Sequence, residues 1–176
     1  MTRKTQEYYD VCFNRIKALV SVLGDTINCS EGYPIEKLIE RNVAIELTPG
    51  LRQAEQSFYI ESFLSFIHQL HLARSVRGER LRLEVIVEEC QYEFDANKEQ
   101  RSTAIEFGVP PINTFVTQFR DFGIGLWLTT NVPEKVARAV HSNTATKLLG
   151  KLSSGFDKEC MCDAMGLDEE EGKAVD

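Results

Sequence analysis

The stretch Arg80–Phe94, RLRLEVIVEECQYEF, decides the predicted fold of this chain. Within it, Leu83–Val87 is a mainly apolar run typical of a buried strand. Two adjacent carboxylates, Glu88 and Glu89, follow directly with no basic residue beside them. Adjacent carboxylates repel each other and lose hydration where a strand end is covered, so an isolated pair costs stability unless a cation or water lies against it. The stretch therefore predicts a strand that ends at a ligand site.

Helices and strands alternate on both sides of this stretch. Residues 7–23 and 54–74 have apolar side chains at helical spacing, and Pro34 opens a short helix between them. Apolar runs and proline positions predict the other elements: a strand at Val43–Leu47 closed by the turn Thr48-Pro49-Gly50, a helix from Pro110 and Pro111 through Phe119, a strand at Ile124–Leu128, a helix from about Pro133 to Val140, and a last strand at Ala145–Leu149. The predicted order is βαβαβαβ.

This alternation predicts an α/β fold with a mainly parallel sheet and helices on both faces, because each parallel return needs a crossover long enough to span the sheet. The length of 176 residues, with 43% apolar and 27% charged residues, fits a single domain. We expect a helical lead-in over about residues 1–42, an α/β core over 43–165 and an acidic tail over 166–176.

Composition excludes several classes of protein. No apolar run approaches the roughly 20 residues that cross a bilayer, and the polar start MTRKTQEYYD lacks the apolar centre of a signal peptide. We therefore expect a cytoplasmic protein without a membrane segment. The five scattered cysteines suit reduced thiols rather than a disulfide framework. His68 and His71 could share a helical face, but no third metal ligand lies nearby in the sequence.

The charge pattern gives no support to direct DNA binding. The formal net charge is −7, and four nearby basic residues are spread across a predicted helix end and strand start, namely Arg74, Arg77, Arg80 and Arg82. An acidic total does not exclude DNA contacts on another part of the molecule or of its assembly.

Polar residues follow three of the predicted strands, at Thr48, at Glu88-Glu89 and at Thr129-Thr130-Asn131. Ligands of open parallel sheets bind at the carboxyl ends of the strands, so we expect these residues along one edge. An apolar strand that ends in two acids has the form of a Walker B segment, in which one carboxylate helps to hold hydrated Mg²⁺ and the other polarises the water that attacks a γ-phosphate.

Asn131 could orient that water or sense the γ-phosphate, because its amide both donates and accepts hydrogen bonds. Structural alternatives stay open for these residues. Asn131 could be the N-cap of the helix that begins near Pro133. Glu88 could simply end the strand while Glu89 caps a following helix, or both acids could be solvated.

Four segments carry a family resemblance: VAIELTPGLRQAEQ before a long helix, LRLEVIVEECQYEF, FRDFGIGLWLTTNVP, and HSNTATKLLGKLSSGFD followed by MGLDEEE. In their order and spacing the chain resembles the C-terminal portion of the HerA/FtsK-like P-loop ATPases, which include HerA helicases, DNA translocases and the ATPases of conjugative secretion systems. The resemblance covers most of the chain. It implies an incomplete RecA-like P-loop NTPase core that uses ATP and Mg²⁺ in a homo-oligomeric ring, with hydrolysis between adjacent subunits.

Position by position, the resemblance implies that Glu89 is the catalytic carboxylate, Glu88 the magnesium-side carboxylate and Asn131 the sensor. It implies a charge-stabilising role near a subunit boundary for Arg120, in the R-x-x-G turn RDFG, and a cofactor-side role for Lys147. The family usually has aspartate at the position of Glu88 and glutamine at that of Asn131, so each side chain differs by one methylene. Arg120 and Lys147 could also be solvated surface residues.

A phosphate-binding loop of the form G-x-x-x-x-G-K-[ST] does not occur in the chain, since Gly150-Lys151 is followed by Leu152 and Gly172-Lys173 by Ala174. Without the N–H groups and lysine of that loop, the acidic pair has little to act on. The sequence therefore favours the C-terminal portion of an ATP-hydrolysing DNA translocase or helicase-type motor, inactive alone. The alternative is a non-catalytic partner or regulatory protein that keeps the half-domain as an interaction module, and an unrelated α/β binding domain is a third possibility.

Overall fold

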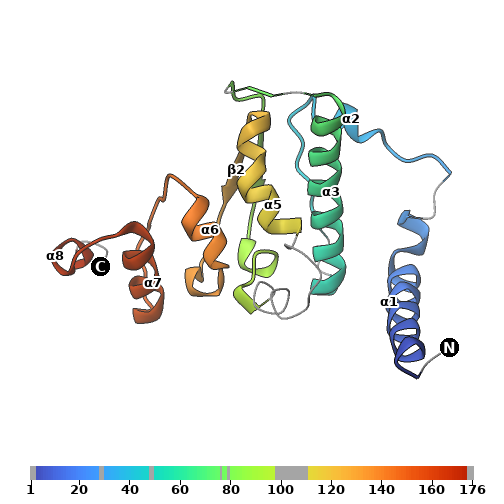
Figure 1. Cartoon of the computed structure of the whole chain (residues 1–176), viewed down its shortest axis with the longest axis horizontal. Coiled ribbons are helices and arrows are strands. Elements are labelled where there is room, and N and C mark those ends of the chain that lie inside the picture. Colours follow the sequence, from blue (N-terminus) through green and yellow to red (C-terminus); the bar gives the residue numbers. More distant parts are fainter. Residues whose placement is uncertain are drawn as a thin grey trace. The chain divides into compact units, whose positions relative to one another are not determined.

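The computed structural model describes residues 3–27, 30–47, 50–75, 77–78, 80–97 and 111–173. Residue contacts divide the chain into two compact units, Met1–Gln56 and Ser57–Asp176. Residues 43–56 of the predicted α/β core therefore group with the helical lead-in. Figure 1 shows both units, with colour following the sequence.

The first unit contains helices α1 (Arg3–Ile27) and α2 (Ile35–Leu38) and the first residues of α3 (Gln53–Ala73). These helices confirm the three that the sequence predicts in this part of the chain. On α1, the rings of Tyr9 and Phe13 stack with their centroids 6.1 Å apart, and both side chains are more than half exposed. The apolar stripe of α1 is thus open to solvent at these positions.

The predicted strand Val43–Leu47 is wrong, because these residues have no regular secondary structure. Val43 and Ile45 are 47% and 54% exposed. A strand is stable when a neighbour takes up its backbone hydrogen bonds, and the sheet found in the described residues does not extend to this segment. Its β-rich composition is therefore not sufficient to make it a strand.

The second unit contains a parallel pair of strands and several short helices (Figure 1). After the larger part of α3 come β1 (Leu83–Val87), the 3₁₀ helix η1 (Cys90–Tyr92), α5 (Pro111–Gln118), the 3₁₀ helix η2 (Phe119–Phe122), β2 (Ile124–Leu128), the 3₁₀ helix η3 (Pro133–Lys135), α6 (Arg138–Asn143), α7 (Gly155–Met165) and α8 (Glu169–Gly172). The described residues therefore form a mixed α/β structure.

β1 and β2 pair in parallel, in a register that runs from Leu83 opposite Ile124 to Val87 opposite Leu128. Both strands have the bounds that the sequence predicts. Helix α5 lies in the connection between them, as a parallel pair requires. The predicted start of this helix at Pro110 lies outside the described residues, and its end at Phe119 is replaced by the 3₁₀ turn η2.

One face of this sheet is buried and the other is open to solvent. Val87 and Ile124 are 7% and 4% exposed, whereas Ile86 and Trp127, which are partners in the register, are 66% and 50% exposed. The core of the unit is formed by residues of α3, α5 and η2 together with the buried strand positions: Leu64, Ile67, Phe115, Phe119, Phe122, Val87 and Ile124. Helices on both faces were predicted, but Ile86 and Trp127 show that part of one face lacks such a cover in the described structure.

The predicted helix from Pro133 to Val140 is divided into η3 and α6. Val136 and Ala137 separate them because both have extended dihedral angles. Val136 forms an antiparallel bridge with Asp95, and the N–H of Ala137 donates to the carbonyl oxygen of Phe94 at 2.6 Å. These tertiary hydrogen bonds override the local helix preference.

The predicted last strand, Ala145–Leu149, is also wrong, since the segment is irregular and Leu148 is 80% exposed. The sequence reading instead missed α7, which begins after Ser154. The Ser154 hydroxyl accepts a hydrogen bond from the N–H of Asp157, and Gly166 ends the helix with a left-handed backbone. These residues are ordinary helix start and stop signals.

Candidate functional site

The carboxyl ends of β1 and β2 meet in one hydrogen-bonded edge. Beyond the last ladder pair, the N–H of Thr129 donates to the carbonyl of Val87 at 3.0 Å, and the N–H of Cys90 donates to the carbonyl of Thr129 at 2.9 Å. These bonds place the two acids after β1 beside the polar residues after β2. The predicted convergence of these two strand ends is confirmed, while the third predicted position, Thr48, lies outside the described residues.

Glu89 ends β1 with a left-handed backbone, at φ 52° and ψ 41°. This conformation costs a residue other than glycine about 1 kcal/mol or more, and such strain is concentrated at functional sites. The turn leads directly into η1. Glu88 and Glu89 are both exposed, so both carboxylates are accessible to a ligand.

Gln91 joins the two strand ends through its side-chain amide, which is only 5% exposed. Its Nε2 donates to a carboxylate oxygen of Glu89 and to Oδ1 of Asn131, the latter at 3.3 Å. Its Oε1 accepts from the hydroxyl of Thr130 at 2.7 Å. That hydroxyl also accepts from the N–H of Val132 at 3.0 Å. The structure therefore brings the predicted carboxylate and sensor together through a third residue.

The two capping alternatives for these residues are wrong. Glu89 stands at the N-cap of η1, but its side chain makes no capping hydrogen bond. At η3 the N-cap is Val132, not Asn131, and it too has no side-chain cap. The Glu89 and Asn131 side chains bond to Gln91 instead. Glu88 is exposed, so solvent or a ligand can surround it.

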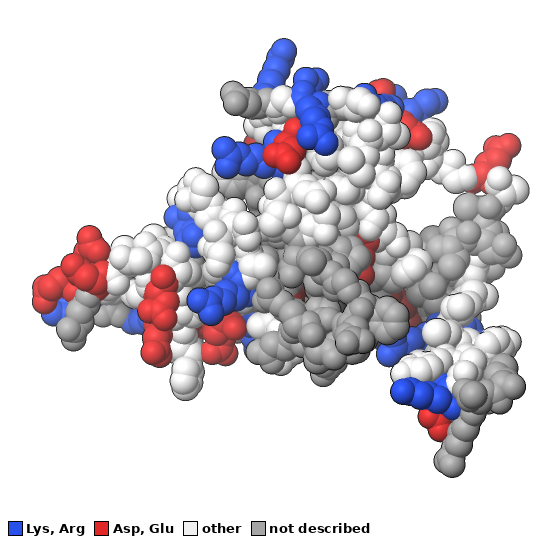
Figure 2. Space-filling model, in the orientation of Figure 1, with Lys and Arg blue, Asp and Glu red and all other residues white. Residues whose placement is uncertain are grey.

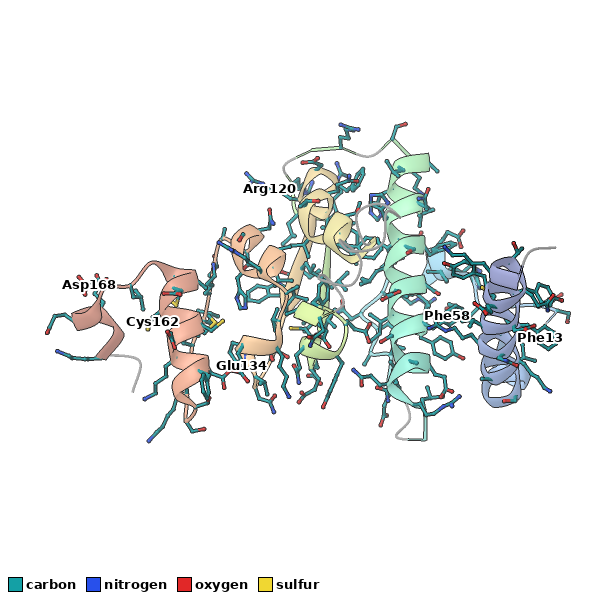
Figure 3. The ribbon with its side chains drawn as sticks, turned by 60° about the horizontal axis from the view of Figure 1, so that its bottom comes forward. Phe13, Phe58, Arg120, Glu134, Cys162 and Asp168 are labelled. Carbon is teal, nitrogen blue, oxygen red and sulfur yellow. The ribbon has the colours of Figure 1, made fainter. Side chains whose placement is uncertain are left out.

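Arg120 lies at the opposite end of β2 from Asn131. It belongs to η2, which precedes the strand, whereas the labelled Glu134 belongs to η3, which follows it (Figure 3). The R-x-x-G turn is closed by Gly123, whose φ of 71° is left-handed and whose N–H donates to the Arg120 carbonyl at 3.0 Å. The five residues of β2 put about 16 Å between the two ends. One subunit does not bring Arg120 to the acidic pair.

Lys147 is likewise not joined to this edge by the contacts of the described residues. It belongs to the irregular segment between α6 and α7, where its Nζ donates to the carbonyl oxygen of Thr144 at 2.8 Å. A phosphate contact by Lys147 would first have to replace this intramolecular bond.

Electrostatics near the site favour neutral thiol and negative carboxylate. Burial, and then the nearby charge of Glu89, raise the pKa of the Cys90 thiol to about 11. In the described part of the chain, no group of three or more histidine, cysteine, aspartate or glutamate residues is arranged to hold a metal ion. His68 instead bonds Gln118 at 2.8 Å, and His71 bonds the Ile67 carbonyl at 2.8 Å. Neither histidine forms a metal site there.

Sequence reasoning missed Gln91, although one signal could have found it. It lies between Cys90 and Phe94, which are 1% and 0% exposed. A glutamine among core residues must find hydrogen-bond partners, and the nearest polar groups along the sheet edge are those after β2.

Comparisons of the chain with protein-family models, with curated proteins and with solved structures find no match. Among the helices that the structure describes, none has the length and apolar character needed to cross a membrane.

Proposed function

We propose that the chain supplies the Walker B and sensor strands of an ATP-hydrolysing motor of the HerA/FtsK-like kind, within an incomplete RecA-like core. One observation carries the proposal: Glu89 and Asn131 meet at the ends of neighbouring parallel strands. An exposed carboxylate beside an amide can polarise an attacking water and contact a γ-phosphate. The carboxyl edge of a parallel sheet is where such ligands bind.

In this proposal Glu89 accepts a proton from the attacking water, and Asn131 donates a hydrogen bond to the water or to a phosphate oxygen. Glu88 lies on the magnesium side. Protein sites commonly hold Mg²⁺ through one or two carboxylates together with waters and phosphate oxygens. A single exposed carboxylate therefore fits this ion, which would neutralise phosphate charge when bound.

The position of Arg120 supports a ring of subunits. Because it lies about 16 Å along β2 from the acidic pair, it would act on the nucleotide of a neighbouring subunit rather than its own. Arginine supplied in this way stabilises charge that develops on the transferred phosphate.

The test is ATP hydrolysis by the polypeptide or complex that joins this chain to a phosphate-binding loop. We expect Glu89→Gln to lower kcat at least about 100-fold, because it removes a positioned proton acceptor. Glu84→Gln is the matched control, since Glu84 is an exposed acid on β1 that bonds Trp127 Nε1 at 3.3 Å and stands away from the site. Unchanged turnover in the Glu89→Gln protein would contradict the proposal. The 176 residues alone should release no measurable phosphate from ATP.

The second unit also offers a surface for the DNA that such a motor would move. Five exposed arginines lie in the loop between α3 and β1 and in η2, and we name them the arginine cluster: Arg74, Arg77, Arg80, Arg82 and Arg120. The two segments are joined by bonds from the N–H of Gly78 to the Asp121 carbonyl (3.2 Å) and from the N–H of Arg82 to the Gly123 carbonyl (2.8 Å). Figure 2 shows basic side chains gathered at this end.

The arginine cluster revises the view, drawn from the sequence, that no basic face exists. Its members make no ion pair within the described residues, although the chain is acidic overall. Unpaired arginines suit phosphate groups, which their planar guanidinium binds in two-pronged fashion.

DNA binding is testable on the chain itself, by fluorescence anisotropy of a labelled oligonucleotide at several salt concentrations. If about four phosphates are neutralised, log Kd should change with log salt with a slope of about 4. The double variant Arg80→Ala/Arg82→Ala should lower that slope by about 2. The variants Lys135→Ala and Lys151→Ala, exposed lysines elsewhere in the unit, are controls. Equal effects of both pairs would exclude the arginine cluster as the DNA surface.

A non-catalytic partner or regulatory protein remains the second candidate function. The exposed pair Ile86 and Trp127 favours it, because parallel sheets normally have both faces covered and this face is open to a partner. This candidate predicts that Glu89→Gln leaves the activity of the assembled motor unchanged, while Trp127→Ser weakens assembly.

A further inference from the structure

The buried amide of Gln91 has each of its polar hydrogen-bonding positions occupied. Its two N–H groups face two acceptors, on Glu89 and Asn131, and its oxygen faces the Thr130 hydroxyl. At 5% exposure, it receives little help from solvent. A buried polar network that is fully satisfied fixes the positions of its members.

The hydrogen bonds also fix which way each amide points. The Thr130 hydroxyl accepts from the Val132 N–H, so its own proton is free to donate and must meet an acceptor, Gln91 Oε1. Gln91 Nε2 is then directed at the carboxylate of Glu89, which cannot donate when ionised. Turning the amide over would oppose its oxygen to a carboxylate oxygen and leave both without a proton between them.

The same reasoning sets the polarity of the sensor. Because Asn131 Oδ1 accepts from Gln91, its Nδ2 points elsewhere, and among the described residues Nδ2 has no acceptor. Asn131 is thereby prepared to donate to a ligand, and Glu89 keeps one carboxylate oxygen to accept a proton. One glutamine thus assigns a donor and an acceptor to opposite sides of the same edge.

We infer that Gln91 is a positioning residue that holds Glu89 and Asn131 in these complementary roles and makes them move together. The inference rests on the proposed function for its consequence in turnover, but the coupling itself is a property of this chain. Through the Thr130 hydroxyl the network also reaches the backbone that enters η3. A shift of the segment after β2 would therefore be transmitted to the carboxylate after β1, which makes Glu89 responsive to what Asn131 contacts.

Nuclear magnetic resonance of the 176-residue chain tests the coupling without ATP. The Asn131 side-chain NH₂ signals, assigned by their loss in Asn131→Asp, should shift in Gln91→Met, which keeps the length and removes the amide. They should also shift in Thr130→Val and stay near the wild-type positions in Thr130→Ser, which keeps the hydroxyl. Gln69→Met is the control, since Gln69 is exposed on α3. Asn131 signals that do not move in Gln91→Met and Thr130→Val would overturn the inference.

Steady-state kinetics of the assembled motor test the consequence. Gln91→Met and Thr130→Val should lower kcat about 10- to 100-fold, as loss of a supporting hydrogen bond does, with KM for ATP within about twofold and with Thr130→Ser close to wild type. A motor that loses turnover in Glu89→Gln but not in Gln91→Met would refute only the positioning role. If Glu89→Gln retains turnover while the Asn131 signals shift as expected, the coupling stands and the ATPase proposal fails.

Discussion

Replacing Gly123 by alanine should destabilise the second unit far more than the same replacement at Gly166. The two glycines have nearly the same left-handed backbone, with φ and ψ of 71° and 30° at Gly123 and of 68° and 30° at Gly166. Both alanines therefore bear the same conformational cost, about 1 to 2 kcal/mol. Any further difference between the two variants comes from their surroundings.

Those surroundings differ sharply. A Cβ at position 123 would lie 2.2 Å from the carbonyl oxygen of Arg80, whereas a Cβ at position 166 would meet nothing within 4 Å. Relief of the contact requires the two backbones to separate by about 1 Å. That movement breaks the 2.8 Å bond from the Arg82 N–H to the Gly123 carbonyl, worth about 1 kcal/mol, at the point where the sheet begins. We expect Gly123→Ala to cost about 3 kcal/mol or more.

Urea unfolding measures both values, followed by far-UV circular dichroism and by the fluorescence of Trp127, the single tryptophan of the chain, which lies on β2. Gly166→Ala should lower the free energy of unfolding by about 1 to 2 kcal/mol. A variant Gly123→Ala that is already unfolded without urea agrees with the expectation. Losses that agree within about 0.5 kcal/mol for the two variants would refute the steric argument.

Two further predictions concern single groups. Because the pKa of the buried Cys90 thiol is raised to about 11, the thiol should react with a disulfide reagent near about pH 8 at least about tenfold more slowly than exposed Cys12, as mass spectrometry of the modified chain can show. The sign for stability follows: the contribution of Cys90 is fully present below about pH 8.5, where the unfolded thiol is protonated, and is lost as the pH rises towards about 11. Asp157→Ala should destabilise the docking of α7 by about 1 to 2 kcal/mol, because Asp157 is buried and accepts from the N–H of Glu134 at 3.1 Å. Asp163→Ala, on the exposed side of α7, should change the urea midpoint little, and equal midpoints would contradict the role of Asp157.

The strands that the sequence predicted correctly are those that find a partner. Leu83–Val87 and Ile124–Leu128 agree to the residue with β1 and β2, because their apolar side chains alternate between a core and a second strand. Val43–Leu47 and Ala145–Leu149 have similar local patterns but no such pairing in the described structure. Local composition reports strand preference, whereas pairing depends on distant segments.

The candidate site shows the same division. Glu89 and Asn131 could be placed near each other from the sequence, since each follows a strand of a parallel pair. The role of Gln91 could not, because it depends on the left-handed turn at Glu89 that directs the chain back along the edge. The proximity of Arg82 to Gly123 likewise requires the fold, since 41 residues separate them in the sequence.

The backbone at position 89 narrows the range of residues that evolution or design could place there. Glycine, asparagine and aspartate tolerate a left-handed backbone, whereas valine and isoleucine do not. A complete substitution scan that selects for folding alone should therefore already reject β-branched residues at this position, before chemistry is considered. A second scan that selects for turnover would separate the two demands, because residues accepted for folding and rejected for turnover identify the contribution of the carboxylate itself.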